Sequence, residues 1–348
     1  MKFNFSRKLW LLLPVFVLIQ CKKDQESTQS SSSSSASIDA PNSVDSVKVD
    51  NTESRIKDSL AKIENQKKEA AKTVIPNKEF HYTGISLKKN DSIAKEFKKK
   101  YTSDEIYTIC AINRVDKRNL NRPDTLVVPS VIEKDFLKYS PFPGNVPVLK
   151  DVKKFVFFSY PIQAFGVYEY GNLVKWGPTS MGKKASQTDR GLHFANWKKE
   201  VSISTVSDEW KLRWNFNISN FQGIGWHQYE LPGYPASHSC LRMLEEDAKW
   251  MYSFADTWIL NKGGATVRAN GTPVYVYGDY KWGGRRPWYN LMDDPKANDM
   301  SVDDMTKVIQ PQLDKILKEQ DNRNQVAAQV LIERAEKKRQ DSLSIGGV

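Results

Sequence analysis

The chain has 348 residues, a hydrophobic content of 39% with ten Trp, and a formal net charge of +11 at pH 7. These values suit one large domain or two smaller ones, and a basic chain favours anionic partners such as nucleic acid, membrane surfaces or acidic polymers. Three Cys are too few for a disulfide framework, and no zinc-ligand spacing, Walker loop or dinucleotide-binding fingerprint is visible in the sequence.

Residues 1–20 have the composition of an export signal: a positively charged start precedes one short apolar run, residues 9–19. This run is too short to span a bilayer comfortably. It ends at Cys21 in a pattern that resembles a bacterial lipobox, although Gln20 replaces the usual small residue. The resemblance implies lipidation of Cys21; an ordinary signal peptide or an uncleaved anchor is the alternative. Each interpretation places the protein outside the cytoplasm.

A Ser-rich segment follows at residues 21–43, and such a composition predicts a flexible tether between a membrane anchor and the folded part. Residues 44–76 are charged, with Ile56, Leu60 and Ile63 at helical spacing. This pattern predicts an exposed helix or a weak coiled coil.

Residues 77–139 have a pattern of their own, with predicted helices over 91–101 and 105–115 and a short strand at 124–129. This order resembles a degenerate LysM glycan-binding module; a plain helical segment leading into the next domain is the alternative. Cys110 lies among apolar residues at helical spacing, which predicts a buried, inert thiol.

Within residues 140–285, expected to form one domain, the pattern changes to strands from Val152. A charged helical tail follows at 286–348, with its helix predicted over 302–340. A hairpin is predicted from two strands joined by the turn Gly171-Asn172. The predicted strands are 155–158, 165–170, 173–176, 201–204, 214–218 and 272–277.

Residues 223–243 concentrate groups that suit nucleophilic catalysis, because they hold Cys240 and two of the four His. A thiol attacks carbonyl carbon as the thiolate, and a nearby imidazole can remove its proton. His227 lies thirteen positions upstream of Cys240, before a Pro-rich loop, and His238 lies two positions away. Both are candidate bases. A buried structural Cys near two unrelated His residues is the alternative.

This segment resembles the active-site signature of the L,D-transpeptidases, the YkuD-like cysteine enzymes of bacterial cell walls. That signature is a His, a loop, Ser/Thr-His-Gly-Cys, an apolar residue and often Arg. The matching residues here are His227 and then Ser237-His238-Ser239-Cys240-Leu241-Arg242. Ser239 replaces the family's Gly. If the backbone needs a positive φ there, Ser239 is strained and the pocket for the oxyanion is reshaped.

The resemblance implies a mainly β fold, an L,D-transpeptidase catalytic β-sandwich at residues 140–285 with flanking α-helical segments. It also implies roles: Cys240 forms a thioester, His227 removes its proton, and the backbone carbonyl of Gln228 orients the His227 ring. Backbone N–H groups of residues 238–240 would stabilise the oxyanion, with Ser237, His238 and Ser239 supporting the loop.

Three residues are candidate substrate contacts: Arg242, Trp226 and Tyr234. Arg242 can pair bidentately with a substrate carboxylate, or form a structural ion pair with Glu245 or Glu246. The aromatic residues Trp214, Trp226, Tyr229 and Tyr234 can line the groove or belong to the core, and for Trp214 we favour the core.

Three further features surround the motif. Acidic residues after Met243 predict a helix N-terminus, whose dipole would stabilise a Cys240 thiolate. The segment 188–193 resembles the family's Thr-Pro-x-Gly-x-Phe turn, which favours a structural or surface position for His193. A disulfide between Cys110 and Cys240 would block the proposed nucleophile and is not expected.

The resemblance also implies a substrate, the peptidoglycan stem peptide, which is attacked at its third residue with release of the terminal D-Ala. A stem amine as acceptor gives a 3→3 cross-link, water gives a carboxypeptidase, and a lipoprotein amine tethers that protein to the wall. No metal or organic cofactor is expected. The contrasting class is an inactive peptidoglycan-binding lipoprotein; nucleic-acid binding has no motif behind it. The expected location is the cell envelope, on the periplasmic side.

Overall fold

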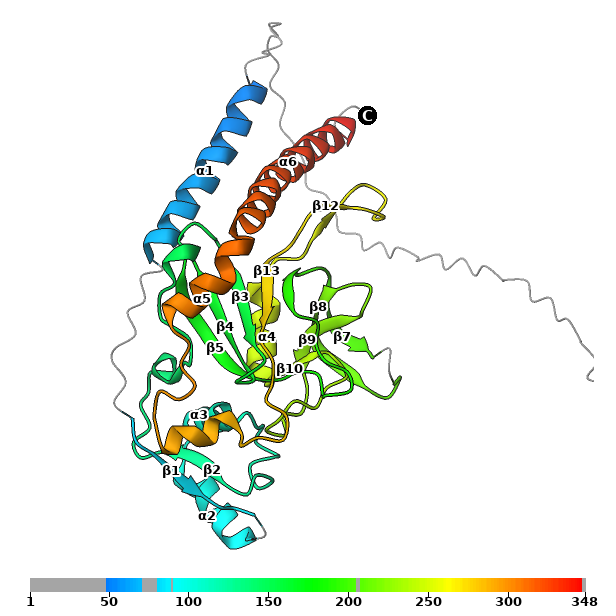
Figure 1. Ribbon diagram of the computed structural model, residues 1–348. Coiled ribbons are helices and arrows are strands. Elements are labelled where there is room, and N and C mark those ends of the chain that lie inside the picture. The colour runs from blue at the N-terminus through cyan, green and yellow to red at the C-terminus, as the bar shows by residue number, and fades with distance from the viewer. Residues whose placement is uncertain (1–47, 71–79, 89, 205–206, 346–348) are drawn as a thin grey trace, which may run out of the picture. The chain divides into compact units, whose positions relative to one another are not determined.

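The computed structural model describes residues 48–70, 80–88, 90–204 and 207–345 (Figure 1). The expected export signal, Ser-rich tether and lipidation site at Cys21 lie outside these ranges. No helix within them combines the length and the apolar character needed to cross a bilayer.

A nine-stranded sheet forms the centre of the described structure. Its strands are β3 (Phe155–Ser159), β4 (Ala164–Glu169), β5 (Asn172–Ser180), β6 (Gly191–Phe194), β7 (Lys198–Ile203), β8 (Lys211–Ser219), β9 (Ile224–Gln228), β10 (Leu241–Met243) and β13 (Pro273–Tyr277). Their order is β6-β13-β3-β4-β5-β10-β9-β8-β7, with β13–β3 and β10–β9 parallel and the other pairs antiparallel. The sheet curls and is flanked by helices (Figure 1), which confirms the expected fold class.

The sequence of β3 is an unbroken apolar run because both faces of this strand are buried. Alternate side chains of a strand point to opposite faces. Phe155 and Phe157 enter one core cluster and Val156 and Phe158 enter a second, and all four are fully buried. A strand that is buried on both faces cannot alternate apolar and polar residues.

The predicted hairpin is present as β4 and β5, but its turn lies one residue earlier than expected. Glu169 pairs with Asn172, so the two turn residues are Tyr170 and Gly171. Both have positive φ, 49° and 77°. A two-residue turn of this kind requires positive φ at both positions, and Gly171 supplies one of them without strain.

The segment before the sheet forms a small unit, in which β1 (Tyr82–Ile85) pairs antiparallel with β2 (Leu126–Pro129) around α2 (Asp91–Lys100) and α3 (Ser103–Asn113). Helix α3 begins with a capping box between Thr102 and Glu105. The predicted helices are confirmed. The interpretation as a glycan-binding module stays a prediction.

The predicted charged regions contain helices: α1 (Lys48–Ala70) lies before the sheet, and α5 (Val302–Ile309) and α6 (Leu313–Ile345) follow it. Helix α4 (Glu245–Phe254) lies within the strand-rich segment, where a helix was expected after Met243. The short strands β11 (Ile259–Leu260) and β12 (Val267–Ala269) pair between α4 and α5. Met305, Ile309 and Ile316 bury their side chains in the first core cluster. The tail predicted at residues 302–340 therefore packs on the sheet through its first turns.

A buried polar contact joins the small unit to the sheet. Asp247 of α4 is fully buried, and its Oδ1 accepts from Tyr107 Oη at 2.6 Å and from Lys175 Nζ at 2.7 Å. Burial raises the pKa of the Asp247 carboxyl, and the Lys175 ammonium opposes this shift. The contact ties α3, β5 and α4 together.

We predict that Lys175→Met destabilises the protein by about 3–5 kcal/mol, because it leaves the Asp247 charge buried without its cation. Urea unfolding measures this change. The control is Lys88→Met, which removes an exposed pair with Asp124 and is expected to cost about 0–1 kcal/mol. Equal losses in the two variants would contradict the prediction.

Candidate active site

Strands β9 and β10 bring the two ends of the motif side by side. Their parallel register places Leu241 opposite Trp226 and Arg242 opposite His227. Cys240 directly precedes β10 and continues this register. Because side chains alternate along a strand, Cys240, Arg242 and His227 share one face of the sheet.

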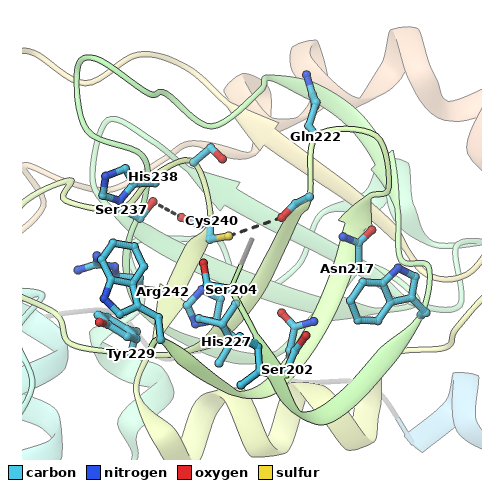
Figure 2. A pocket seen from close by; sticks show the side chains of 17 residues that line it. Ser202, Ser204, Asn217, Gln222, His227, Tyr229, Ser237, His238, Cys240 and Arg242 are labelled. Atoms are coloured by element: carbon cyan, nitrogen blue, oxygen red, sulfur yellow. Dashed lines mark hydrogen bonds between the residues drawn. The ribbon is translucent and has the colours of Figure 1, made fainter. Parts of the chain in front are cut away.

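A cavity of about 130 Å³ opens on this face, and Cys240, His227 and Arg242 surround it (Figure 2). Arg242 is the charged residue of the lining, and no carboxylate among the described residues contributes to it. The other lining residues are Trp197, Ser202, Ile203, Ser204, Trp210, Leu212, Asn215, Asn217, Gln222, Gly223, Tyr229, Ser237, His238 and Ser239. The cavity therefore suits a ligand that is anionic near the sulfur.

The His227 ring is buried and held in one orientation. Its Nδ1–H donates to the backbone carbonyl of Gln228 at 3.0 Å, as expected from the resemblance. This bond fixes the proton on Nδ1 and leaves Nε2 able to accept another. Burial lowers the pKa of His227 to about 4, against the opposing effect of the Gln228 carbonyl. The ring is therefore neutral at pH 7.

Cys240 is a free, partly buried thiol. Its Sγ donates to the carbonyl of Gly223 at 3.8 Å (Figure 2). Burial raises the pKa of the Cys240 thiol, while the Gly225 backbone and the Arg242 guanidinium oppose that shift. A neutral thiol beside a neutral imidazole is the resting state, so Cys240, if it acts as a nucleophile, would lose its proton as it attacks.

Helix α4 begins at Glu245, as expected, but its N-terminus lies too far from Cys240 for the expected dipole effect. Strand β10 intervenes, and its three residues advance about 10 Å before the helix starts at Glu245. The effect of a helix dipole falls off within the first turn. The raised pKa of Cys240 agrees with this correction.

The loop before Cys240 is held through its carbonyl oxygens. Ser237 Oγ donates to the Cys240 carbonyl at 2.5 Å, Thr188 Oγ1 donates to the Ser239 carbonyl at 2.8 Å, and Lys183 N–H donates to the Ser237 carbonyl at 2.9 Å. In a trans peptide, a carbonyl and the N–H of the next residue point in opposite directions. The N–H groups of His238 and Cys240 therefore point away from these anchors.

Ser239, which stands where the family has Gly, has a φ of 91°. This lies in the left-handed region, where a side chain costs roughly 1–2 kcal/mol. The positive φ that the sequence analysis considered for this position is thus present, and the backbone of Ser239 is strained.

His238 occupies a different place from His227. Its ring is exposed, lies 5.3 Å from the Trp210 ring between centroids, and its Nε2 accepts from Lys183 Nζ at 2.8 Å. Partial burial and then the nearby Lys183 and Arg242 cations lower the pKa of His238. With that nitrogen engaged by Lys183, the geometry favours His227 over His238 as the base.

Arg242 makes neither of the ion pairs considered from the sequence. Its guanidinium lies over the Tyr229 ring, 4.5 Å from the centroid, and Nη1 donates to the Glu230 carbonyl at 3.4 Å. None of the ion pairs among the described residues includes it. Its charge remains available to an anionic ligand.

Two expected substrate contacts need correction. Trp226 is fully buried and packs in the second core cluster with Phe216. It directly precedes His227, which faces the cavity, and so its side chain points to the opposite face of the sheet. Tyr234 is exposed but does not line the cavity; its ring lies 5.8 Å from the Arg286 guanidinium. Trp214, expected in the core, packs against that same cluster.

Several cavity residues were missed from the sequence, among them Trp210, Asn215 and Asn217. The two Asn residues alternate along β8 with the buried Phe216. This alternation is visible in the sequence and places both on one face. Their position beside His227 depends on the register with β9, which the sequence does not contain.

Cys110 is buried and unpaired, which confirms its expected burial, and burial raises its pKa to about 12. Cys110 and Cys240 form no disulfide. Within the described ranges, no group of three or more His, Cys, Asp or Glu side chains is arranged to hold a metal ion.

Comparison with known proteins identifies the family of the strand-rich segment. Residues 153–276 match the family model of the L,D-transpeptidase catalytic domain, YkuD. This part of the chain is therefore an L,D-transpeptidase family domain, and that family acts on peptidoglycan in the cell envelope. The comparison with curated proteins found no match.

The chain is also similar to solved structures, each of which is named as an L,D-transpeptidase. An L,D-transpeptidase from Stackebrandtia nassauensis shares 20% identity, with 37% of this chain and 57% of that one covered and a TM-score of 0.30. One from Mycobacterium smegmatis shares 20% (36% and 59%, TM-score 0.29), and one from Mycobacterium tuberculosis H37Rv shares 22% (36% and 58%, TM-score 0.29). The chain spans less than two thirds of each of these proteins.

We predict a pH-dependent stability that originates at His227. Its pKa is about 4 in the folded protein and 6.5 in its ordinary state, so the unfolded chain binds the proton first as the pH falls. The stabilisation is complete above pH 6.5 and is lost by about pH 4, a change of about 3 kcal/mol.

Urea unfolding at pH 7 and pH 4 tests this prediction. The stability of His227→Gln should fall less between the two pH values, because the variant lacks the contribution of the His227 ring. His238→Gln, altered at an exposed ring, should keep the pH dependence of the wild type. The same fall in stability for His227→Gln and the wild type would contradict the assignment.

A second prediction concerns the strained backbone. Ser239→Gly should raise the free energy of unfolding by about 1 kcal/mol, because Gly adopts a positive φ without steric cost. Ser239→Ala keeps the Cβ and should give no such gain. Urea unfolding of the three proteins at pH 7 makes the comparison, and a destabilised Ser239→Gly would refute it.

Proposed function

We propose that the protein is a cysteine L,D-transpeptidase that acts on peptidoglycan stem peptides through a thioester. The observation that supports this best is the pairing of β9 with β10. It places the Cys240 sulfur and the His227 ring on one face of the sheet, in one cavity, with the His227 tautomer fixed by Gln228.

In the proposed reaction, Nε2 of His227 takes the thiol proton while Sγ of Cys240 attacks the carbonyl at the third residue of the stem peptide. The neutral resting pair makes this a general-base step. Collapse of the tetrahedral intermediate forms the thioester, and the proton passes from His227 to the departing D-Ala amine. An acceptor amine then attacks the thioester and restores the thiol.

Charge in the transition state is stabilised from two sides. The N–H groups of His238 and Cys240 point away from the anchored carbonyls and would donate to the oxyanion, with Ser237 and Ser239 supporting the loop. Arg242, partly buried and without a carboxylate partner among the described residues, would bind a carboxylate of the substrate.

The acceptor decides the biological outcome: a stem amine gives a 3→3 cross-link, water gives an L,D-carboxypeptidase, and a protein amine tethers that protein to the wall. The proposal includes a lipid anchor at Cys21 and a place on the periplasmic side of the envelope. Both rest on the sequence of the first residues, which lie outside the described ranges.

A second candidate is a peptidoglycan-binding protein of the same fold with little or no activity. The observation that favours it is the strained Ser239, next to the nucleophile and within the proposed oxyanion pocket. Strain at this position can misplace the N–H donors.

We predict that the wild-type protein, incubated with disaccharide tetrapeptides, forms a cross-linked dimer, and that a carbapenem forms a thioester adduct detectable by mass spectrometry. Cys240→Ala should form neither. His227→Gln should lower the rate by about 10²–10⁴-fold, the usual contribution of a general base.

Conservation of fold in these variants is checked by urea unfolding. Binding of the tetrapeptide with no product and no adduct in the wild type would favour the binding protein. Adduct formation that persists in Cys240→Ala would refute the assignment of the nucleophile.

A further inference from the structure

The connection between His227 and Cys240 is held by a turn that lies outside the family match. We define the 114–119 turn as residues 114–119, which follow α3. Leu231 N–H donates to Asp116 Oδ2 at 2.8 Å, and Asp116 N–H donates back to the Leu231 carbonyl at 3.1 Å. Gly233 N–H donates to the Arg114 carbonyl at 2.9 Å.

The Asp116 carboxylate is itself fixed within the turn. Oδ1 accepts from the N–H groups of Arg118 and Asn119 at 2.8 and 3.1 Å, and Oδ2 also accepts from Asn119 Nδ2 at 2.9 Å. Asn119 Nδ2 in turn donates to the Leu231 carbonyl at 3.1 Å. These bonds hold the Asp116 carboxylate in the position from which it accepts the hydrogen bond of Leu231 N–H.

Arg114 anchors the turn to the rest of the protein. Its side chain is buried, with Nε donating to the Ile162 carbonyl at 2.9 Å and Nη1 to the Ala111 carbonyl at 2.9 Å. Its φ of 55° ends α3 and redirects the chain toward Asp116.

The second half of the same connection is held by the matched domain. Ser180 Oγ donates to the Tyr234 carbonyl at 2.7 Å and accepts from Ala236 N–H at 3.2 Å, and Ser237 N–H donates to the Met181 carbonyl at 3.0 Å. The connection thus has two supports. The support nearer to His227 is the one supplied by the 114–119 turn.

The contact at Leu231 lies three positions after Gln228, whose carbonyl orients the His227 ring. If Leu231 is released, the end of β9 loses its fixed continuation and the Gln228 carbonyl loses its position. We propose that Asp116 is a positioning residue for the reaction: by holding Leu231, it keeps His227 aligned with Cys240. This inference rests on the proposed function.

The test uses Asp116→Asn in the full chain, which replaces one carboxylate oxygen by an NH₂ group that cannot accept from Leu231 N–H. The rate of Cys240 acylation by a saturating carbapenem should fall about tenfold, the effect of losing one hydrogen bond to a charged group. The half-saturating concentration should stay unchanged, because the cavity lining is intact.

The pH profile separates positioning from a general loss of structure. The Gln228 carbonyl raises the pKa of His227, so weakening that bond should move the acidic limb of the acylation profile to lower pH. Partial unfolding would lower the acylation rate at every pH and leave the pKa of the acidic limb unchanged. That result would overturn the proposal.

The matched control is Asp124→Asn, which changes an exposed carboxylate of the same unit that pairs with Lys88 and should acylate like the wild type. If Asp116→Asn does not fold, Asn119→Ala, which removes a donor to Leu231, should slow acylation in the same direction. Acylation of Asp116→Asn at the wild-type rate overturns this inference alone. No acylation of the wild type overturns the proposed function and this inference with it.

Discussion

Strands β9 and β10 are parallel neighbours that residues 229–240 connect. Parallel strands need a connection of a dozen or more residues, which is usually a helix that satisfies its own backbone. This connection is an irregular loop with two prolines, so its N–H and carbonyl groups need partners elsewhere. Ser180 and Met181 supply them on one side and the 114–119 turn on the other, and the alignment of His227 with Cys240 depends on both.

The surroundings of the two reactive groups determine how they can work. Burial disfavours charge on each group, since it raises the pKa of Cys240 and lowers that of His227. The resting state is therefore not an ion pair of a Cys240 thiolate and a His227 imidazolium. Arg242 is the charged group that lines the cavity, which leaves anionic ligands as the class favoured by its field.

The sequence predicted what depends on near neighbours in the chain. The contact between His227 and Gln228, which the family resemblance implied, joins adjacent residues, and the family's glycine had raised a positive φ at Ser239 as a condition. Trp226 was wrongly proposed as a substrate contact, because a shift of one residue along a strand moves a side chain to the opposite face of the sheet. The strand boundaries were not known from the sequence. Asp116 gave no signal at all, since its partner Leu231 lies 115 positions away and the contact uses a backbone N–H that every non-proline residue possesses.

The first core cluster combines residues from the whole length of the described chain: Phe80 and Ile112 come before the sheet, Phe157 and Trp176 lie on it, and Ile316 comes far after it. Residues as late as Ile316 complete the cover over β3–β5, so any folding intermediate that lacks α5 and α6 leaves aromatic side chains of this face partly exposed. Such an intermediate is prone to aggregation.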